Sequence, residues 1–221
     1  SGFFLLINIF TIFLFSFFFS NFLELSILSN HKIAIICISI FLVGYLDDRI
    51  SLKPNIRLLL FSLIFFLFLH YDSTYILQNI KIDKFEFSLS NNYAVFFTII
   101  CFVIYLNAFN FFDGINLQAG LHTIFIYSIL LFKLNFNFEI IFLVLFYIFF
   151  LIMNGKNLVF LGNSGAYLSA TLISIFIIFY FKQNILSTTE IFILMSFPGL
   201  DMLRIIIDRL SKMKNPLKGD L

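Results

Sequence analysis

The sequence predicts an all-α fold, a polytopic bundle of about eight membrane-spanning helices with a small strand pair near residues 76–90. Two observations lead to this prediction. Hydrophobic residues make up 61% of the 221 residues and charged residues 12%, with a mean hydropathy of +1.04, which would make a soluble domain of this length aggregate. The apolar residues also form runs that approach the roughly 20 residues of a helical membrane crossing, without the alternation of barrel strands.

Eight apolar segments are separated by short polar connections. They comprise residues 3–19, 27–46, 57–71, 93–109, 115–132, 138–153, 164–181 and 190–207. The longest connection, Asp72 to Asn92, contains Ile80 to Phe87, whose period-two alternation predicts an amphipathic strand pair at one membrane surface. We expect a single integral membrane domain over residues 1–221. Because the chain begins with Ser1 rather than Met and stops abruptly, we expect it to be truncated at both ends.

The positive charges are distributed unevenly if successive connections alternate between the two membrane faces. One face then holds both chain ends and nine of the 14 basic residues: Arg49, Lys53, Arg57, Lys156, Arg204, Arg209, Lys212, Lys214 and Lys218. By the positive-inside rule this face is predicted to be cytoplasmic. Nearly every unusual polar cluster falls on the same face.

The first polar cluster is GYLDDR at residues 44–49, followed by Lys53 and Arg57. The adjacent carboxylates of Asp47 and Asp48 repel each other unless a cation or a base shares the site, and hard cations such as Mg²⁺ bind carboxylate oxygens. The pair is therefore a candidate metal and catalytic site. The alternative is a solvated loop that carries ordinary surface charges.

The second cluster is NAFNFFDG at residues 107–114. Asn107 and Asn110 are about one helical turn apart and Asp113 follows three residues later, so the three side chains drift along one helix face. Polar groups in or beside a bilayer are costly and usually face a water-filled cavity or one another. The cluster is thus either part of a site or a patch of hydrogen bonds between helices.

The third cluster begins with the polar residues Asn154 to Asn157 and leads to GNSGA at residues 162–166, just before an apolar run. Small residues bracket Asn163 and Ser164, and backbone N–H groups at the start of a helix can hold a phosphate. The alternative is close helix packing through small residues.

The fourth cluster is PGLDMLR at residues 198–204, within the last apolar run. Asp201 follows an expected kink at the Pro-Gly pair, and its depth in the run favours a functional role. Arg204 is expected to form an ion-pair ladder with Asp201 and Asp208.

Four motifs in this order and on one face resemble those of the polyprenyl-phosphate N-acetylhexosamine-1-phosphate transferases. That superfamily includes the bacterial enzyme that makes lipid I and the enzymes that start O-antigen, enterobacterial common antigen and teichoic acid synthesis. The resemblance covers nearly the whole chain. It implies Mg²⁺-dependent transfer of a sugar 1-phosphate from a UDP-N-acetylhexosamine to polyprenyl (undecaprenyl) phosphate with release of UMP, on the cytoplasmic face of the bacterial inner membrane, to initiate cell-envelope glycan synthesis. The lipid bilayer and a second copy of the chain are further expected partners, and nucleic acid is not.

The resemblance also implies roles for individual residues. Those implied to be catalytic are Asp47, Asp48 and Asp113. Those implied to bind substrate are Asn107, Asn110, Arg57, Lys53, Asp201 and Ser164. The implied ligands of Mg²⁺ are Asp47, Asp48, Asp113 and Asn163. At Asn163 the family carries a metal-ligating aspartate, and an amide oxygen can replace it as a ligand but contributes no charge.

Two other functions compete with this one. A transporter would place its ionisable residues near the bilayer midplane and often shows repeated halves, whereas these clusters lie at one membrane edge. A catalytically silent relative would keep the fold as a scaffold after losing the aspartate at Asn163.

Overall fold

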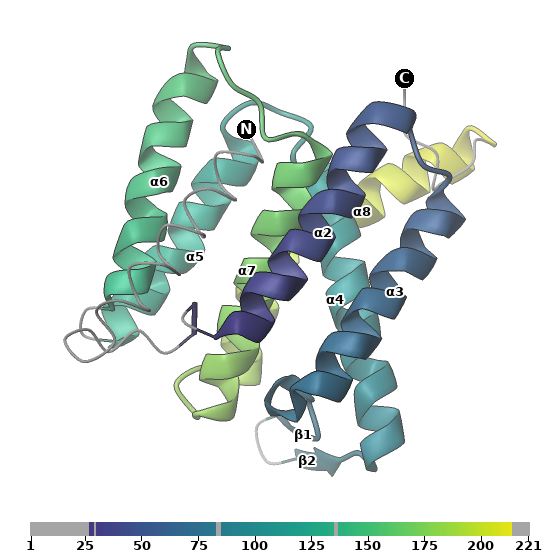
Figure 1. The fold of residues 1–221 in the computed structure, drawn as a ribbon, viewed down its shortest axis with the longest axis vertical. Coiled ribbons are helices and arrows are strands. Elements are labelled where there is room, and N and C mark those ends of the chain that lie inside the picture. Colours follow the sequence, from purple (N-terminus) through teal and green to yellow (C-terminus); the bar gives the residue numbers. More distant parts are fainter. Residues whose placement is uncertain (1–26, 29, 83–84, 135–136, 214–221) are drawn as a thin grey trace.

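The computed structural model describes residues 27–28, 30–82, 85–134 and 137–213. Figure 1 shows a helical bundle with one small hairpin at its lower end. The helices described are α2 (His31–Ile50), α3 (Pro54–Tyr71), α4 (Asn91–Phe112), α5 (Gln118–Leu134), α6 (Phe138–Gly155), α7 (Gly162–Lys182) and α8 (Thr188–Ser211). A short 3-10 turn, η1 (Ser73–Tyr75), and the strands β1 (Asn79–Ile82) and β2 (Phe85–Ser88) connect α3 to α4.

Four described helices are long and apolar enough to cross a bilayer, namely α3, α4, α6 and α7. The prediction of eight spans is therefore wrong for the described part of the chain. Helix α5 is apolar but has only 17 residues, while α2 and α8 carry too many charges in every window of spanning length. Asp47 and Asp48 on α2 and Asp201 on α8, which were predicted as site residues, are among the charges that exclude these two helices as spans. The expected segment 3–19 lies outside the described residues.

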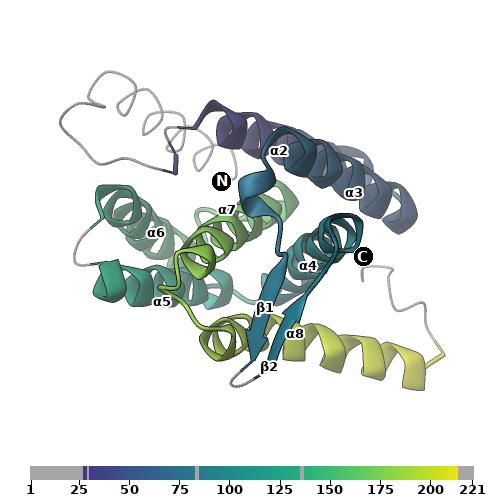
Figure 2. The ribbon, with the colours of Figure 1, turned by 90° about the horizontal axis from the view of Figure 1, so that it is seen from below.

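Helix α7 is the centre of the bundle. It is buried almost all round, whereas fewer than half of the residues of α3, α4 and α6 are buried. Helices α2, α4 and α5 pack against it, and the view along the helices in Figure 2 shows α7 enclosed between them. Its first half is rich in small residues, including Gly165, Ala166 and Ala170, which let neighbouring backbones approach closely.

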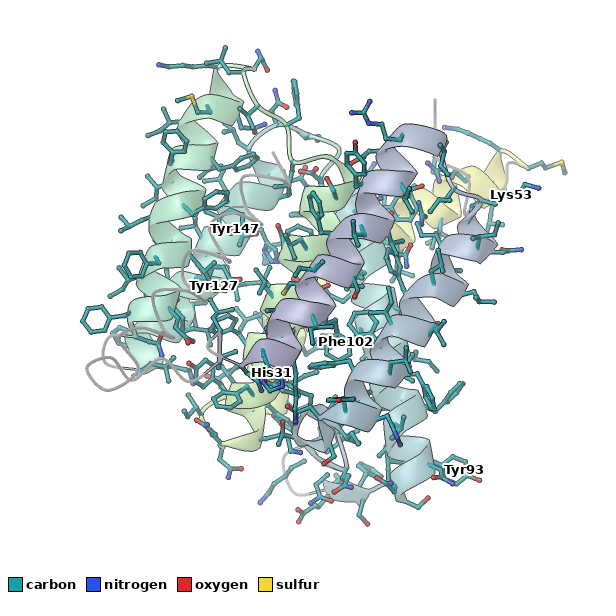
Figure 3. All side chains as sticks on the ribbon, in the orientation of Figure 1. His31, Lys53, Tyr93, Phe102, Tyr127 and Tyr147 are labelled. Atoms are coloured by element: carbon teal, nitrogen blue, oxygen red, sulfur yellow. The ribbon has the colours of Figure 1, made fainter. Side chains whose placement is uncertain are left out.

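Successive helices run in opposite directions, so the connections fall at two ends of the bundle (Figure 1). We call one end the aspartate end; it holds the α2–α3, α4–α5 and α6–α7 connections. The hairpin end holds η1, β1, β2 and the α7–α8 connection. Figure 3 shows Lys53 at the aspartate end and His31 and Tyr93 at the hairpin end. The expected alternation of connections is confirmed for these helices, and three of the four polar motifs lie at the aspartate end.

The expected strand pair near residues 76–90 is confirmed. Strands β1 and β2 pair antiparallel, with Asn79 opposite Ser88 and Ile82 opposite Phe85. Helix α8 packs against β1, and the Thr188 hydroxyl at the start of α8 donates a hydrogen bond to the Lys81 carbonyl.

Candidate active site

The candidate site begins where α2 meets the start of α7, and close packing sets the distance between the two helices. A Cβ added to Gly44 of α2 would lie 2.5 Å from Cα of Ser164, so only glycine fits at this contact. Asp48 follows Gly44 by four residues and therefore projects from the same face of α2, one turn closer to the aspartate end. Its carboxylate is thereby brought over the first turn of α7.

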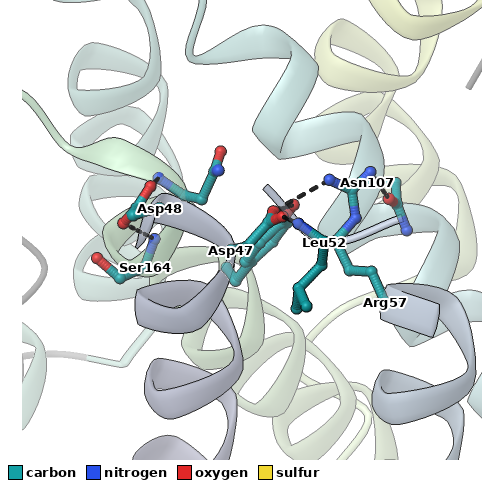
Figure 4. A network of polar contacts seen from close by, with 8 residues as sticks. Asp47, Asp48, Leu52, Arg57, Asn107 and Ser164 are labelled. Atoms are coloured by element: carbon teal, nitrogen blue, oxygen red, sulfur yellow. Dashed lines mark hydrogen bonds and ion pairs between the residues drawn. The ribbon is translucent and has the colours of Figure 1, made fainter. Parts of the chain in front are cut away.

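The carboxylate of Asp48 accepts hydrogen bonds from the first free N–H groups of α7. Oδ1 accepts from the Asn163 N–H at 2.9 Å and Oδ2 from the Ser164 N–H at 3.1 Å (Figure 4). Leu161 at the N-cap position has no side-chain hydrogen bond to offer, so Asp48 caps the helix from a distant part of the chain. The positive end of the helix dipole also favours a carboxylate here. Gly162 has a φ of 67°, a conformation that favours glycine. A Cβ at this position would lie 3.4 Å from Oδ2 of Asp48, so the glycine leaves space beside the carboxylate.

The neighbouring carboxylate of Asp47 turns inward, and the residue as a whole is only 5% exposed. Its Oδ1 accepts the Leu52 N–H at 2.9 Å, while Oδ2 accepts from Arg57 Nη1 at 3.1 Å and from the Tyr167 hydroxyl at 3.2 Å. A buried charge is tolerated when it has an opposite charge and enough hydrogen-bond donors. Asp47 has both, and therefore serves as the anion of a buried ion pair in this structure.

Arg57 extends this network across the bundle. Its Nη2 donates to Oδ1 of Asn107 at 3.4 Å, and the guanidinium carbon lies 5.7 Å from the centre of the Tyr167 ring. Because Arg57 stands on α3, Asp47 on α2, Asn107 on α4 and Tyr167 on α7, the network joins four helices. Figure 4 shows Asp47 and Arg57 at its centre and Asp48 with Ser164 to one side.

The structure thus brings together five of the residues predicted from the sequence: Asp47, Asp48, Arg57, Asn107 and Ser164, with the backbone of Asn163. The two aspartates face different partners, so adjacency in sequence does not make them a pair in space. Among the described residues, no group of three or more His, Cys, Asp and Glu side chains is placed to hold a metal ion.

Asp113 lies just beyond the last residue of α4 and is half-buried. Removal from solvent raises the pKa of its carboxyl group to about 7. Asn110 is also half-buried, one turn before it. In the described structure the network of Figure 4 includes Asn107 but neither Asn110 nor Asp113.

The remaining predicted site residues have other surroundings. Asp201 forms an ion pair with Arg204, 2.8 Å from Nη2, as expected from their spacing. Asp208 pairs with Lys212 at 2.8 Å. Helix α8 continues through Pro198. Lys53 is exposed at the N-cap position of α3.

Sequence reasoning missed two contributors to the site. Tyr167 follows Asn163 by four residues on α7 and so lies on the same helix face, but its motif position gave no sign that its hydroxyl meets Asp47. Asn154 was predicted only as the first residue of the third polar cluster, with no role of its own. Its Oδ1 accepts the Leu117 N–H at 2.7 Å and its Nδ2 donates to the Val159 carbonyl at 2.8 Å, which ties the α4–α5 and α6–α7 connections together.

Comparison with known proteins assigns the family. The model of glycosyl transferase family 4 matches residues 30–181, from the start of α2 to the end of α7. No curated protein matches the sequence. The matched region contains every residue of the Asp47, Asp48 and Arg57 network and leaves α8 outside. Family membership supports, in general terms, transfer of a sugar phosphate to a polyprenyl phosphate, and the apolar helices agree with a membrane protein. More than half of the chain is matched, and the chain therefore belongs to glycosyl transferase family 4.

Proposed function

We propose that this protein transfers N-acetylhexosamine 1-phosphate from a UDP-sugar to polyprenyl phosphate at the aspartate end of the bundle. A phosphate oxygen of the acceptor would form a bond to the sugar-bearing phosphorus of the UDP-sugar, the bond from that phosphorus to the bridging oxygen would break, and UMP would leave with the bond's electron pair. The lipid phosphate lies at headgroup level and the nucleotide is soluble, so the chemistry has to take place at a membrane edge. The observation that carries the proposal is the meeting of Asp48 with the start of α7 at one such edge.

Phosphoryl transfer depends mainly on positioning and on stabilising negative charge. In the proposal, Mg²⁺ is the cofactor and neutralises charge on the phosphates. Asp48 and the amide oxygen of Asn163 would hold it, because Mg²⁺ is commonly bound by one or two carboxylates together with substrate phosphates. Asp48 is exposed, and each of its oxygens accepts a single hydrogen bond from Asn163 or Ser164, so lone pairs remain for such an ion.

Asp47 has a different role in this proposal. Three donors surround its carboxylate, so it is a poor candidate for the direct metal ligand that the sequence suggested. It instead holds Arg57, whose positive charge then lies beside Asn107 at the same end of the bundle. Arg57 would attract the phosphates, and Asp47 would fix the guanidinium.

Exchange of labelled UMP into a UDP-N-acetylhexosamine pool tests the proposal. The full-length protein would be assayed with Mg²⁺ and undecaprenyl phosphate. We expect exchange by the wild type and a loss of at least about 100-fold in Asp48→Asn, because a preorganised charge at the reacting phosphates is removed. Full activity of Asp48→Asn would contradict the role of this carboxylate. Omitting the lipid phosphate should abolish exchange.

A second candidate function follows from Asn163, which stands where the family carries a metal-ligating aspartate. A catalytically silent relative would show no exchange as the wild type and would gain exchange on Asn163→Asp. If the wild type already exchanges UMP, this second function is ruled out. We further propose that the aspartate end faces the cytoplasm of a bacterium, because seven of the basic residues that the structure describes lie toward it and four toward the other end.

A further inference from the structure

The hairpin formed by β1 and β2 has two faces of opposite character. Cross-strand partners share a face, and residues two apart along a strand return to it. Ile80 pairs with Phe87 and Ile82 with Phe85, so these four make one entirely apolar face. The opposite face carries the pairs Asn79 with Ser88 and Lys81 with Glu86. The ribbon is therefore amphipathic.

The apolar face is turned toward the helices. The Leu89 N–H donates to the Gln78 carbonyl at 2.8 Å, which continues the ladder by one pair beyond Ser88. Leu89 follows Phe87 by two residues and so stands on the apolar face, and its side chain packs against the hydrophobic core of the bundle. Figure 2 shows both strands lying across the hairpin end between α4 and α8. The apolar face is thus on the side of the ribbon from which Leu89 packs against the bundle, and Lys81 and Glu86 are on the opposite side.

The described part of the chain leaves most of this face uncovered, and only Ile80 is half-buried. Phe85 is 71% exposed, Phe87 54% and Ile82 46%. A two-stranded ribbon is at best marginally stable in water by itself, and a cluster of exposed aromatic residues on one face calls for an apolar environment to bury it.

The ends of two spans fix the depth of this face. Helix α4 has 22 residues and is about 33 Å long, enough to cross a hydrocarbon core of roughly 30 Å. Phe87 precedes the first residue of α4 by four residues, so an extended chain keeps it within about 14 Å of that end of the span. Tyr71 at the end of α3 and Tyr93 in the first turn of α4 are both exposed at the same end, and Figure 3 shows Tyr93 pointing outward. Tyrosines at span ends are typical of the membrane interface.

We propose that the β1–β2 hairpin lies on the membrane surface at the hairpin end, with Ile80, Ile82, Phe85 and Phe87 in the boundary between the phospholipid headgroups and acyl chains. Lys81 and Glu86 face water. The strands connect α3 to α4, two candidate spans whose outer surfaces expose large apolar side chains, which is why lipid is the occupant. Through the hydrogen bond from Thr188 to the Lys81 carbonyl, the ribbon also holds the start of α8 at the membrane surface. The proposal does not depend on the proposed catalytic activity.

The absence of tryptophan from the sequence gives a direct test. Each of Phe85→Trp, Phe87→Trp and Glu86→Trp would carry the sole tryptophan of the chain. The variants would be reconstituted in phosphatidylcholine vesicles with or without bromine on the acyl chains close to the glycerol. We expect brominated lipid to quench most of the emission of Phe85→Trp and Phe87→Trp and little of that of Glu86→Trp. Acrylamide in the water should show the reverse order.

Two results would overturn the proposal. One is quenching of all three variants to the same extent by acrylamide, because the ribbon would then lie free in water. The other is protection of Phe85→Trp and Phe87→Trp from both quenchers, because protein would then cover the face. Repeating this measurement with one chain per nanodisc identifies the cover: protection that disappears indicates a second copy of the chain, and protection that persists indicates the same chain. Two separate phenylalanine positions guard against a single variant that fails to fold.

Discussion

Gly44 of α2 lies directly against the backbone of Ser164 in the first turn of α7, at a separation that leaves no room for a side chain. This contact determines how far Asp48 reaches over the α7 N-terminus, because only four residues separate Gly44 from Asp48. The approach of the two helices and the position of the carboxylate are consequences of the same small residue.

Gly44→Ala should therefore disturb both stability and activity. The added methyl group would meet Cα of Ser164 at 2.5 Å, and relieving the clash requires α2 and α7 to move apart, at a cost of about 1–3 kcal/mol. We expect a lower melting temperature in detergent and weaker UMP exchange. Gly199→Ala is the matched control, since nothing lies within 4 Å of a Cβ at that position. Equal melting temperatures for both variants would show that the α2–α7 contact is not critical.

Asp47→Asn should destabilise the protein because it leaves the largely buried guanidinium of Arg57 without its counterion. Side-chain exposures in the pair are 14% for Arg57 and 4% for Asp47. Breaking a buried pair from one side costs on the order of 3 kcal/mol. The double variant Asp47→Leu with Arg57→Met removes both charges and should regain part of the lost melting temperature. If the double variant melts below the single one, the pair is not the source of the loss.

Tyr167→Phe removes one hydroxyl from Asp47 and keeps the ring. A lost hydrogen bond of about 1 kcal/mol corresponds to roughly a fivefold change in rate, so we expect kcat for UMP exchange to fall about fivefold with little change in KM. Tyr147→Phe is the matched control, because the Tyr147 hydroxyl also makes one buried hydrogen bond, at 2.5 Å to Ser169, but takes no part in the network of Figure 4. Identical kcat values in the two variants would argue against a positioning role for Tyr167.

Asp113 should make stability depend on pH. Burial raises its pKa to about 7 from an ordinary value of 3.8. Between these values the folded state holds a proton that the unfolded state releases, so the stability from this group is present at low pH and is lost as pH rises toward 7. Asp113→Asn cannot ionise. Between pH 5 and pH 8 its free energy of unfolding should rise by on the order of 2 kcal/mol relative to that of the wild type. The difference in melting temperature between the two proteins measures this change. A parallel pH dependence of Asp113→Asn and wild type would be the contrary result.

The polar connections between the helices, and the motifs in them, could be predicted from the sequence. Composition, the length of apolar runs and turn residues act locally along the chain. The strand pair followed from the alternation of apolar and polar residues on either side of Asp83 and Lys84. The gathering of polar motifs at one end followed from the alternation of helix directions. The number of spans did not follow, because a run of apolar residues with charges at its end, such as residues 27–46, forms a helix whether or not it can cross the bilayer by itself.

A helical membrane bundle, its family and the residues available for a site could all be inferred from the amino-acid sequence. Which partners each of those residues contacts depends on how the helices pack. Asp47 and Asp48 are adjacent in the chain, but successive positions on a helix point about 100° apart. One carboxylate therefore turns to Arg57 and Tyr167 and the other to the N–H groups of Asn163 and Ser164. Those partners lie on other helices, which contact α2 only through tertiary packing. The local sequence does not show which helix lies on which side of α2.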